Sequence, residues 1–161
     1  MDVIWAPWRM QFILGDKMAG CFLCAALAEA PSEGNLVLAH TEHALVIMNR
    51  YPYITGHLMV TPRRHVSKLS DLSEVEMAGL QRAVSSTVSA LERAATPHGF
   101  NIGMNLGKAA GAGVEDHIHY HVVPRYYGDN NSMNIFAEVR VIPEDLIVTW
   151  RRLRPFFNGM S

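Results

Sequence analysis

The sequence predicts an antiparallel α+β fold, in which short strands follow one another along the chain with only two main helices. At 161 residues the chain favours one domain over residues 1–161, long enough to bury a core without disulfides. Hydrophobic residues make up 49% and charged residues 18%, as in ordinary globular proteins. The order of the strands and helices is predicted from the residue patterns along the chain.

The first part of the chain reads as an arm, a short helix and three strands. Residues 1–20 hold Trp5 and Trp8 around a proline and are expected to pack as an N-terminal arm on the body or on a partner subunit. Residues 22–29 could form a short helix. Turn residues and β-forming runs then predict strands over residues 36–39, 44–49 and 57–61.

The longest helix is predicted over residues 74–95. Ser73 and Glu76 form a capping box at its start, and Pro97 and Gly99 end it. Apolar residues at helical spacing mark its inner face: Val75, Leu80, Val84, Val88 and Leu91.

The last part of the chain is expected to complete the sheet. An alternating strand is predicted over residues 100–106, followed by a histidine-rich strand. In a C-terminal extension over residues 126–161, a further strand at about 135–141 precedes a short helix opened by Pro143.

Charge and hydropathy exclude several classes of function. The net charge is −1, so no broad basic field indicates nucleic-acid binding. No apolar run approaches the length of a membrane span, and the N-terminus lacks the basic and apolar regions of a signal peptide. We therefore expect a cytoplasmic protein with neither nucleic acid nor membrane as a partner.

The most informative stretch is HIHYHVVPR, residues 117–125. A strand would place His117, His119 and His121 on one face, about 6.6 Å apart. That spacing suits groups arranged along a polyanion better than three ligands around one metal ion. Imidazole is neutral and nucleophilic near pH 7. A metal-binding tract or a polar strand face is the simpler alternative, but buried polar groups need partners in an otherwise apolar strand.

The loop before this strand, residues 105–113, is rich in glycine and alanine. Glycines let backbone amides approach an anion closely, and Asn105 can donate from its side-chain amide. A flexible hairpin is the alternative, but the position of the loop directly before the histidines favours phosphate binding.

Cys21 and Cys24 form a Cys-x2-Cys pair in a chain with no export signal. This spacing is common in one half of a zinc site, and redox chemistry and an apolar free pair are the alternatives.

The residues of three segments resemble a known family. HIHYHVV fits the pattern of the histidine triad superfamily of nucleotide hydrolases and transferases, and Pro124-Arg125 follows it as in the family. Asn49-Arg50 followed by Gly56-His57-Leu58-Met59-Val60 resembles the upstream family segment. The resemblance covers residues 21–125. Trp5–Met10 and Gly128–Glu144 look like the bacterial branch related to diadenosine tetraphosphate phosphorylases and fragile histidine triad hydrolases.

The resemblance implies a fold and a reaction. The fold is a five-stranded antiparallel sheet with one long helix and one or two short ones, and homodimers join two sheets into a ten-stranded one. The reaction is cleavage of dinucleoside polyphosphates at the α-phosphate through a covalent nucleotidyl-histidine. His119 would be the nucleophile, His121 would hydrogen-bond the α-phosphate, and His57 would support the triad.

The resemblance also implies nucleotide contacts: Asn105 and the amides around Gly111 and Gly113 on phosphate, Asn49 on ribose, and Ile47 and Met59 at the base. The loop departs from the family because Ala112-Gly113 stands where relatives carry a Gln or Ser donor. Backbone amides or Lys108 could replace that donor, so the choice between hydrolysis and phosphorolysis stays open.

The resemblance implies a structural zinc site in which His65 and His117 complete the Cys21–Cys24 pair, with His40 and His43 as competing ligands. Mg²⁺ could also bind with the substrate. Three alternatives remain: a nucleotide-binding regulatory module with little turnover, a nucleoside phosphoramidase, and a zinc-dependent structural protein.

Overall fold

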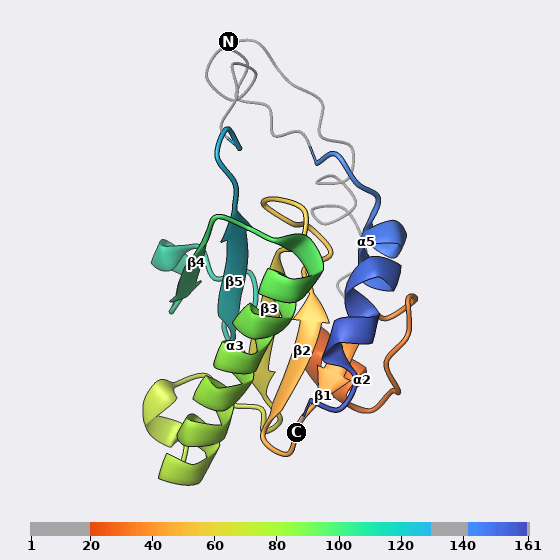
Figure 1. Cartoon of the computed structure of the whole chain (residues 1–161). Helices are drawn as coiled ribbons and strands as arrows, with labels where there is room; N and C mark the ends of the chain where they lie inside the picture. Colours follow the sequence, from red (N-terminus) through yellow and green to blue (C-terminus); the bar gives the residue numbers. More distant parts are fainter. Residues whose placement is uncertain (1–19, 130–141, 161) are drawn as a thin grey trace.

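The computed structural model describes residues 20–129 and 142–160 of the 161-residue chain. Their core is a five-stranded antiparallel sheet in the order β1-β2-β3-β5-β4 (Figure 1). The strands are β1 (Val37–His40), β2 (Ala44–Met48), β3 (Leu58–Pro62), β4 (Gly99–Met104) and β5 (Tyr120–Arg125). The α+β prediction is confirmed, and the first four strand boundaries agree with the predicted ones to within two residues.

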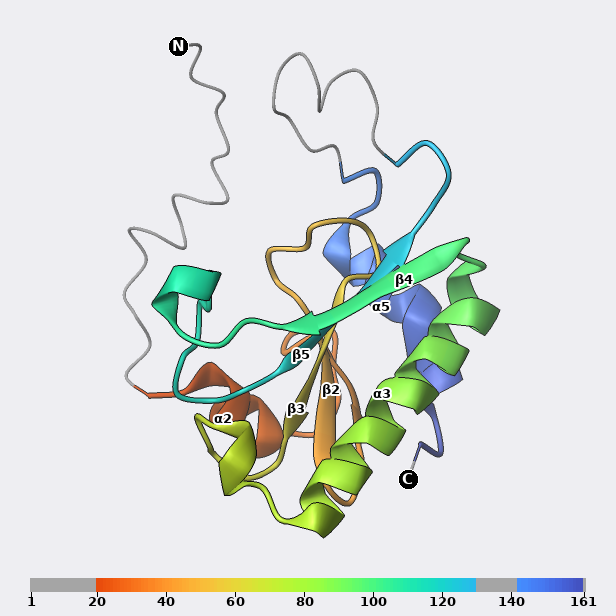
Figure 2. The same ribbon diagram turned by 90° about the vertical axis from the view of Figure 1, so that its left-hand side faces the viewer.

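The helices lie on two sides of the sheet. The long helix α3 (Glu74–Ala95) contacts β2, β3 and β5, and α5 (Leu146–Leu153) packs beside it. The short helix α2 (Phe22–Leu27) lies on the other side (Figure 2). Three 3-10 segments, η1 (Leu69–Asp71), η2 (Lys108–Ala110) and η3 (Arg154–Phe157), complete the described elements. None of the described helices has the length and apolar character needed to cross a membrane.

The long helix has the predicted boundaries because its end signals are local. The Ser73 side chain accepts a hydrogen bond from the Glu76 backbone N–H, and the Glu76 carboxylate accepts one from the Ser73 N–H. Leu80, Val84 and Leu91 are buried as predicted, whereas Val75 is 62% exposed. Val75 lies in the first turn, and the buried residues of the helix begin at Gly79.

The histidine segment differs from the prediction of one continuous strand. The paired strand β5 begins at Tyr120, so His117 and His119 precede it. The chain at Ile118 is instead held by two other contacts. Its N–H donates to the Val66 carbonyl at 2.9 Å, and its carbonyl accepts from the Thr61 hydroxyl at 2.9 Å. The backbone of this segment is therefore fixed by tertiary hydrogen bonds rather than by a strand ladder.

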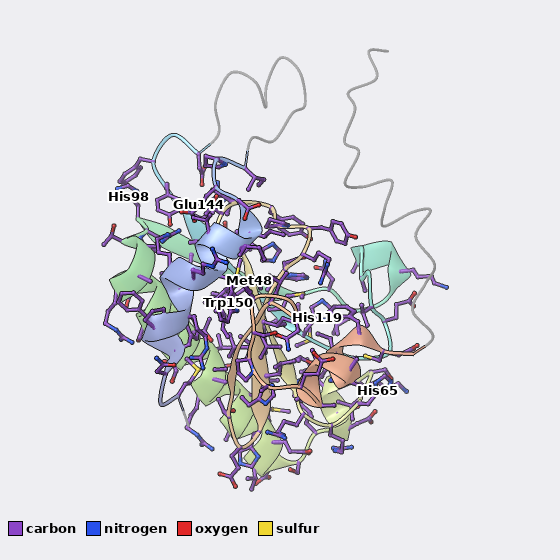
Figure 3. All side chains as sticks on the ribbon, turned by 90° about the vertical axis from the view of Figure 1, so that its right-hand side faces the viewer. Met48, His65, His98, His119, Glu144 and Trp150 are labelled. Atoms are coloured by element: carbon purple, nitrogen blue, oxygen red, sulfur yellow. The ribbon has the colours of Figure 1, made fainter. Side chains whose placement is uncertain are left out.

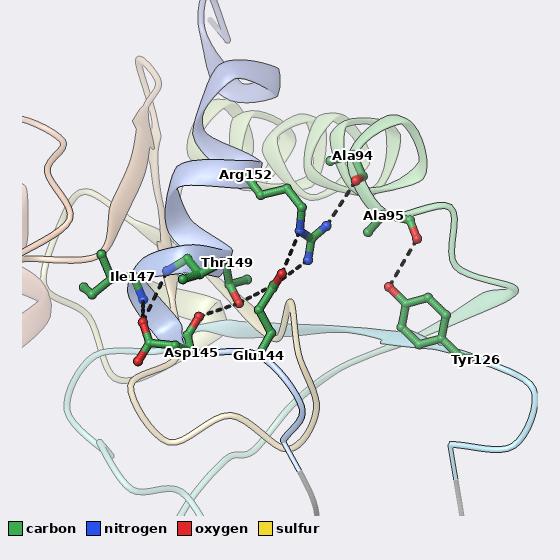
Figure 4. Close-up of polar contacts among 9 residues, drawn as sticks. Ala94, Ala95, Tyr126, Glu144, Asp145, Ile147, Thr149 and Arg152 are labelled. Atoms are coloured by element: carbon green, nitrogen blue, oxygen red, sulfur yellow. Dashed lines mark hydrogen bonds and ion pairs between the residues drawn. The ribbon is translucent and has the colours of Figure 1, made fainter.

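The C-terminal helix begins at Leu146, three residues later than predicted from Pro143. Asp145 is the N-cap, and its carboxylate accepts from the backbone N–H groups of Ile147 and Val148. Arg152 of this helix donates to Glu144 and to the Ala94 carbonyl near the end of α3 (Figure 4). The predicted arm up to residue 19 and the predicted strand at 135–141 lie outside the described residues.

Candidate active site and metal centre

The strand register places the predicted site residues in one row across the sheet. Ile47 of β2 pairs with Met59 of β3, Met59 pairs with His121 of β5, and His121 pairs with Gly103 of β4. Directly opposite residues share a face of an antiparallel sheet. Val122, which alternates with His121, is fully buried on the face that α3 covers. The row therefore lies on the opposite face, where an ideal Cβ at Gly103 would meet no other atom within 4 Å.

Hydrogen bonds fix the positions of the ring protons on His57 and His121. The backbone N–H of Tyr53 donates to His57 Nδ1 at 3.1 Å, so the His57 proton lies on Nε2. His57 Nε2 in turn lies 2.9 Å from His121 Nδ1 and donates to it. The neutral His121 ring therefore carries its own proton on Nε2, where it can donate to a bound anion.

His119 has the opposite arrangement of proton and lone pair. Its Nδ1 lies 3.0 Å from the His117 carbonyl oxygen, which can only accept, so the proton is on Nδ1. Its Nε2 then carries the lone pair that a nucleophile requires, in a residue that is only 5% exposed. The rings of His119 and His121 are edge-on, with centroids 4.9 Å apart. A nucleophilic nitrogen and a hydrogen-bond donor are thus neighbours in one site.

Burial keeps His121 neutral at physiological pH. Desolvation is the main cause and the nearby His119 the second, and together they lower the pKa of His121 to about 4. His121 therefore acts as a neutral donor rather than as an imidazolium ion at pH 7.

Asn49 lies beside His57, and the glycine-rich loop has a defined backbone conformation. The Asn49 amide nitrogen lies 3.5 Å from His57 Nδ1, and its amide oxygen accepts from the Tyr51 N–H. In the loop, Gly107 and Gly111 have φ values of 78° and 81°, which other residues rarely adopt. The Gly111 N–H donates to the Lys108 carbonyl at 2.9 Å, so this amide is used within the loop itself.

The Lys108 side chain is largely exposed and lies near Glu115. Its ammonium group lies 3.7 Å from the Glu115 carboxylate, and the Lys108 side chain is 87% exposed. The contribution of Asn105, Gly111 and Gly113 to phosphate binding stays a prediction.

The four predicted metal ligands come together in one cluster. The ligand atoms of Cys21, Cys24, His65 and His117 all lie within 4.8 Å of one another. The Cys24 sulfur is 3.2 Å from His65 Nδ1, and the Cys21 sulfur is 3.3 Å from His117 Nδ1. Figure 3 shows His65 beside α2, which contains Cys24 and has Cys21 as its N-cap.

The chemistry of this cluster fits a tetrahedral ion. Ligands at zinc bond lengths of about 2.0–2.3 Å would lie about 3.3–3.8 Å apart, close to the separations seen here. His117 Nε2 lies 2.8 Å from the Pro62 carbonyl and donates to it, which leaves the Nδ1 lone pair facing the sulfurs. Burial lowers the pKa of His117, which favours the neutral ring that a metal ligand needs. The competing His43 ring packs against Gly79 of α3 instead, away from the cluster.

Sequence reasoning missed two contributors to the site, Tyr53 and Pro62. The Pro62 carbonyl orients His117, and the Tyr53 N–H orients His57. Both act through backbone atoms, which any residue type supplies, so no sequence pattern marks them.

Comparison with known proteins places this geometry in a family. The HIT domain, named for the histidine triad, matches residues 31–128. AP-4-A phosphorylase of Mycobacterium tuberculosis is 37% identical over 158 residues, covering 93% of this chain and 81% of that protein. The asymmetrical bis(5'-nucleosyl)-tetraphosphatase of Schizosaccharomyces pombe is 32% identical over 96 residues, covering 60% of this chain and 52% of that protein.

A solved structure agrees in fold. The Zn-bound histidine triad family protein from Mycobacterium smegmatis has a TM-score of 0.67 at 30% identity, and the match covers 88% of this chain and 95% of that one. The matched domain, the related sequences and the shared fold establish that this chain belongs to the histidine triad family.

Proposed function

We propose that this protein cleaves dinucleoside polyphosphates, such as diadenosine tetraphosphate, at an α-phosphate through a covalent nucleotidyl-histidine. The main support for the proposal is that the neighbouring rings of His119 and His121 carry their protons on different nitrogens. His119 presents a lone pair on Nε2, and His121 presents an N–H on Nε2. The site thus holds one nucleophile and one donor for the charge that develops on a phosphoryl oxygen.

The reaction has two steps. His119 Nε2 attacks the α-phosphorus, an N–P bond forms, and the bond from phosphorus to the bridging oxygen breaks. The electron pair of that bond leaves with the rest of the polyphosphate. Water or inorganic phosphate then breaks the N–P bond and frees His119. Water yields a nucleoside monophosphate, and phosphate yields a nucleoside diphosphate.

The names of the relatives support this substrate class and differ in the acceptor. The relative matched over 93% of the chain is named a phosphorylase, and the one matched over 60% is named a tetraphosphatase. We therefore propose inorganic phosphate as the acceptor. Ala112-Gly113 stands where the hydrolases carry a Gln or Ser side chain that donates to the leaving phosphate. The residues that contact the leaving group therefore differ from those of the hydrolases.

A product assay tests both the substrate and the acceptor. Diadenosine tetraphosphate and adenosine phosphoramidate are incubated with and without inorganic phosphate, and the products are separated. ADP and ATP that form only with phosphate would support the proposal. AMP that forms without phosphate would replace phosphorolysis by hydrolysis, and turnover of the phosphoramidate alone would favour the phosphoramidase alternative.

The covalent step has its own test. His119→Ala should lose turnover and should not retain label from α-³²P substrate after acid-free denaturation, whereas the unmodified protein should retain it. A His119→Ala variant with full turnover would exclude the covalent mechanism, and binding without turnover in the unmodified protein would favour the regulatory module.

We propose that Zn²⁺ occupies the Cys21, Cys24, His65 and His117 cluster as a structural ion. Two sulfur and two imidazole ligands suit zinc, and the Zn-bound relative supports the choice. The ion would link α2 to two other segments, through His65 after β3 and His117 before β5. Mg²⁺, if present, would bind with the polyphosphate substrate.

We also propose a homodimer that pairs β4 with β4 of a second copy. The other edge strand, β1, contacts η3 and the Trp150 side chain of α5, whose indole donates to the Val37 carbonyl at 2.9 Å (Figure 3). At the β4 edge, Asn101, Ile102 and Gly103 are exposed. An uncovered edge strand is a template for pairing, and β4–β4 pairing would give a ten-stranded sheet.

A further inference from the structure

The loop between β2 and β3 carries an aromatic side chain over the histidine pair. The Tyr53 ring centroid lies 4.4 Å from that of His57 and 5.8 Å from that of His121, and the ring planes are tilted by 37° and 33°. The Tyr53 residue is 44% exposed, whereas His57 is 1% exposed. One side of the tyrosine ring therefore lies against the imidazoles while part of the residue remains at the surface.

The same residue contacts the pair through its backbone. The Tyr53 N–H donates to His57 Nδ1 at 3.1 Å, and this bond sets the proton arrangement that runs through His57 to His121. The backbone donor and the covering ring belong to one residue, so movement of either would disturb the other.

We propose that Tyr53 is a positioning residue for His121, in which the ring covers the His57–His121 pair and keeps water from competing for its internal hydrogen bond. Water at this place could donate to His121 Nδ1 or accept from His57 Nε2. Because water can either donate to His121 Nδ1 or accept from it, this exchange would remove the preference for the tautomer with the proton on Nε2. The effect on catalysis rests on the proposed function, whereas the effect on the rings does not.

Of the three rings in contact with His121, Tyr53 is the one that also reaches the surface, so it lies between the histidine pair and solvent. The titratable groups with ring contacts to His121 are His57, His119 and Tyr53 itself. The directly paired residues on the adjacent strands are Met59 on β3 and Gly103 on β4, which carry no charge. Desolvation is the largest cause of the low pKa of His121, so removing a covering ring should raise it.

Nitrogen-15 NMR of the histidine rings tests the proposal without any substrate. In the unmodified protein and in Tyr53→Phe, the His121 shifts should report a proton on Nε2 and a lone pair on Nδ1. In Tyr53→Ala, the two nitrogens should move towards averaged shifts, and the pKa of His121 should rise by about one unit or more. Unchanged His121 shifts and pKa in Tyr53→Ala would overturn the proposal, as would an equal change in Tyr53→Phe. Unaltered shifts at the distant His98 would show that Tyr53→Ala is folded.

Kinetics with two substrates separate positioning from nucleoside stacking. Diadenosine tetraphosphate and adenosine 5'-tetraphosphate carry the same phosphate chain, but only the first has a second nucleoside. Tyr53→Ala should lower kcat about 10–100-fold on both substrates, and Tyr53→Phe should change it less than about threefold. A loss confined to KM for diadenosine tetraphosphate would mean that the ring binds the second nucleoside, and it would overturn positioning. If the unmodified protein turns over neither substrate, the proposed function fails while the NMR result still decides the role of Tyr53.

Discussion

The hydroxyl of Thr61 should control the position of the nucleophile although it lies outside the substrate site. Thr61 is fully buried on β3, and its hydroxyl donates to the Ile118 carbonyl at 2.9 Å. Ile118 stands between His117 and His119, so this bond anchors the backbone that carries both the metal ligand and the nucleophile. Thr61→Val keeps the shape of the side chain but leaves the Ile118 carbonyl without this donor.

The structure sets the expected size of the effect. An unsatisfied buried carbonyl costs about 1–3 kcal/mol, which corresponds to a decrease in Tm of about 2–12 °C for a chain of this length. A shift of the Ile118 backbone would also move His119 relative to His121. We therefore expect kcat to fall about tenfold or more, because small displacements of reacting groups carry large kinetic costs.

Thr87→Val is the matched control. Thr87 is also fully buried, but its hydroxyl donates to the Ala83 carbonyl one turn earlier in its own helix. That carbonyl still accepts the backbone N–H of the helix, so the substitution leaves no unsatisfied acceptor. Thermal unfolding and steady-state kinetics are measured for both variants. Equal losses in the two variants, or an unchanged kcat in Thr61→Val, would refute the anchoring role.

Three further predictions address the metal cluster, the loop and the pH dependence. Cys24→Ser should reduce bound zinc to well below one ion per chain and lower Tm, as measured by metal analysis and calorimetry; full zinc content would contradict the ligand assignment. Gly111→Ala places an alanine at a backbone φ of 81°, which should lower the free energy of unfolding by about 1–2 kcal/mol in chemical denaturation. Gly34→Ala should lower it less, because no atom lies closer than 3.9 Å to the added methyl group. The pKa of His121 is lowered to about 4 in the folded state, so unfolded chains bind more protons between about pH 6.5 and 4. The free energy of unfolding should therefore decrease as pH falls through that range, and His121→Gln should show a smaller decrease; an identical pH profile would contradict the burial of a neutral ring.

Local signals were sufficient for the main helix and for most strands. The capping box at Ser73 and Glu76 acts within four residues, and it located the start of α3 without knowledge of the sheet. By contrast, the ladder of β5 begins at Tyr120 because the chain before it bonds to Thr61 and Val66. Those partners lie more than 50 residues away in the sequence. The period-two pattern of the histidine segment therefore could not show that its backbone bonds to them and not to a neighbouring strand.

The site was predictable to a similar extent. Side-chain chemistry marked the cysteines and the histidine motif, and the family resemblance supplied the pairing of His65 and His117 with the cysteines. The proton positions were not predictable, because they depend on three backbone groups: the Tyr53 N–H and the carbonyls of Pro62 and His117. The side chain of Tyr53 escaped notice for the same reason, since only the folded loop brings its ring to His57.

His117 connects the metal cluster to the reaction through a single residue. Its ring faces the two sulfurs through Nδ1, and its backbone carbonyl accepts a hydrogen bond from His119 Nδ1–H. Any ion held by the ring therefore also restrains the carbonyl that fixes the lone pair on His119 Nε2. An ion can influence the chemistry in this way without touching phosphate, because it acts on the orientation of the nucleophile. Loss of metal and loss of the Thr61 bond should then have the same kinetic signature, a decrease in kcat with little change in KM, since both release the backbone on either side of Ile118.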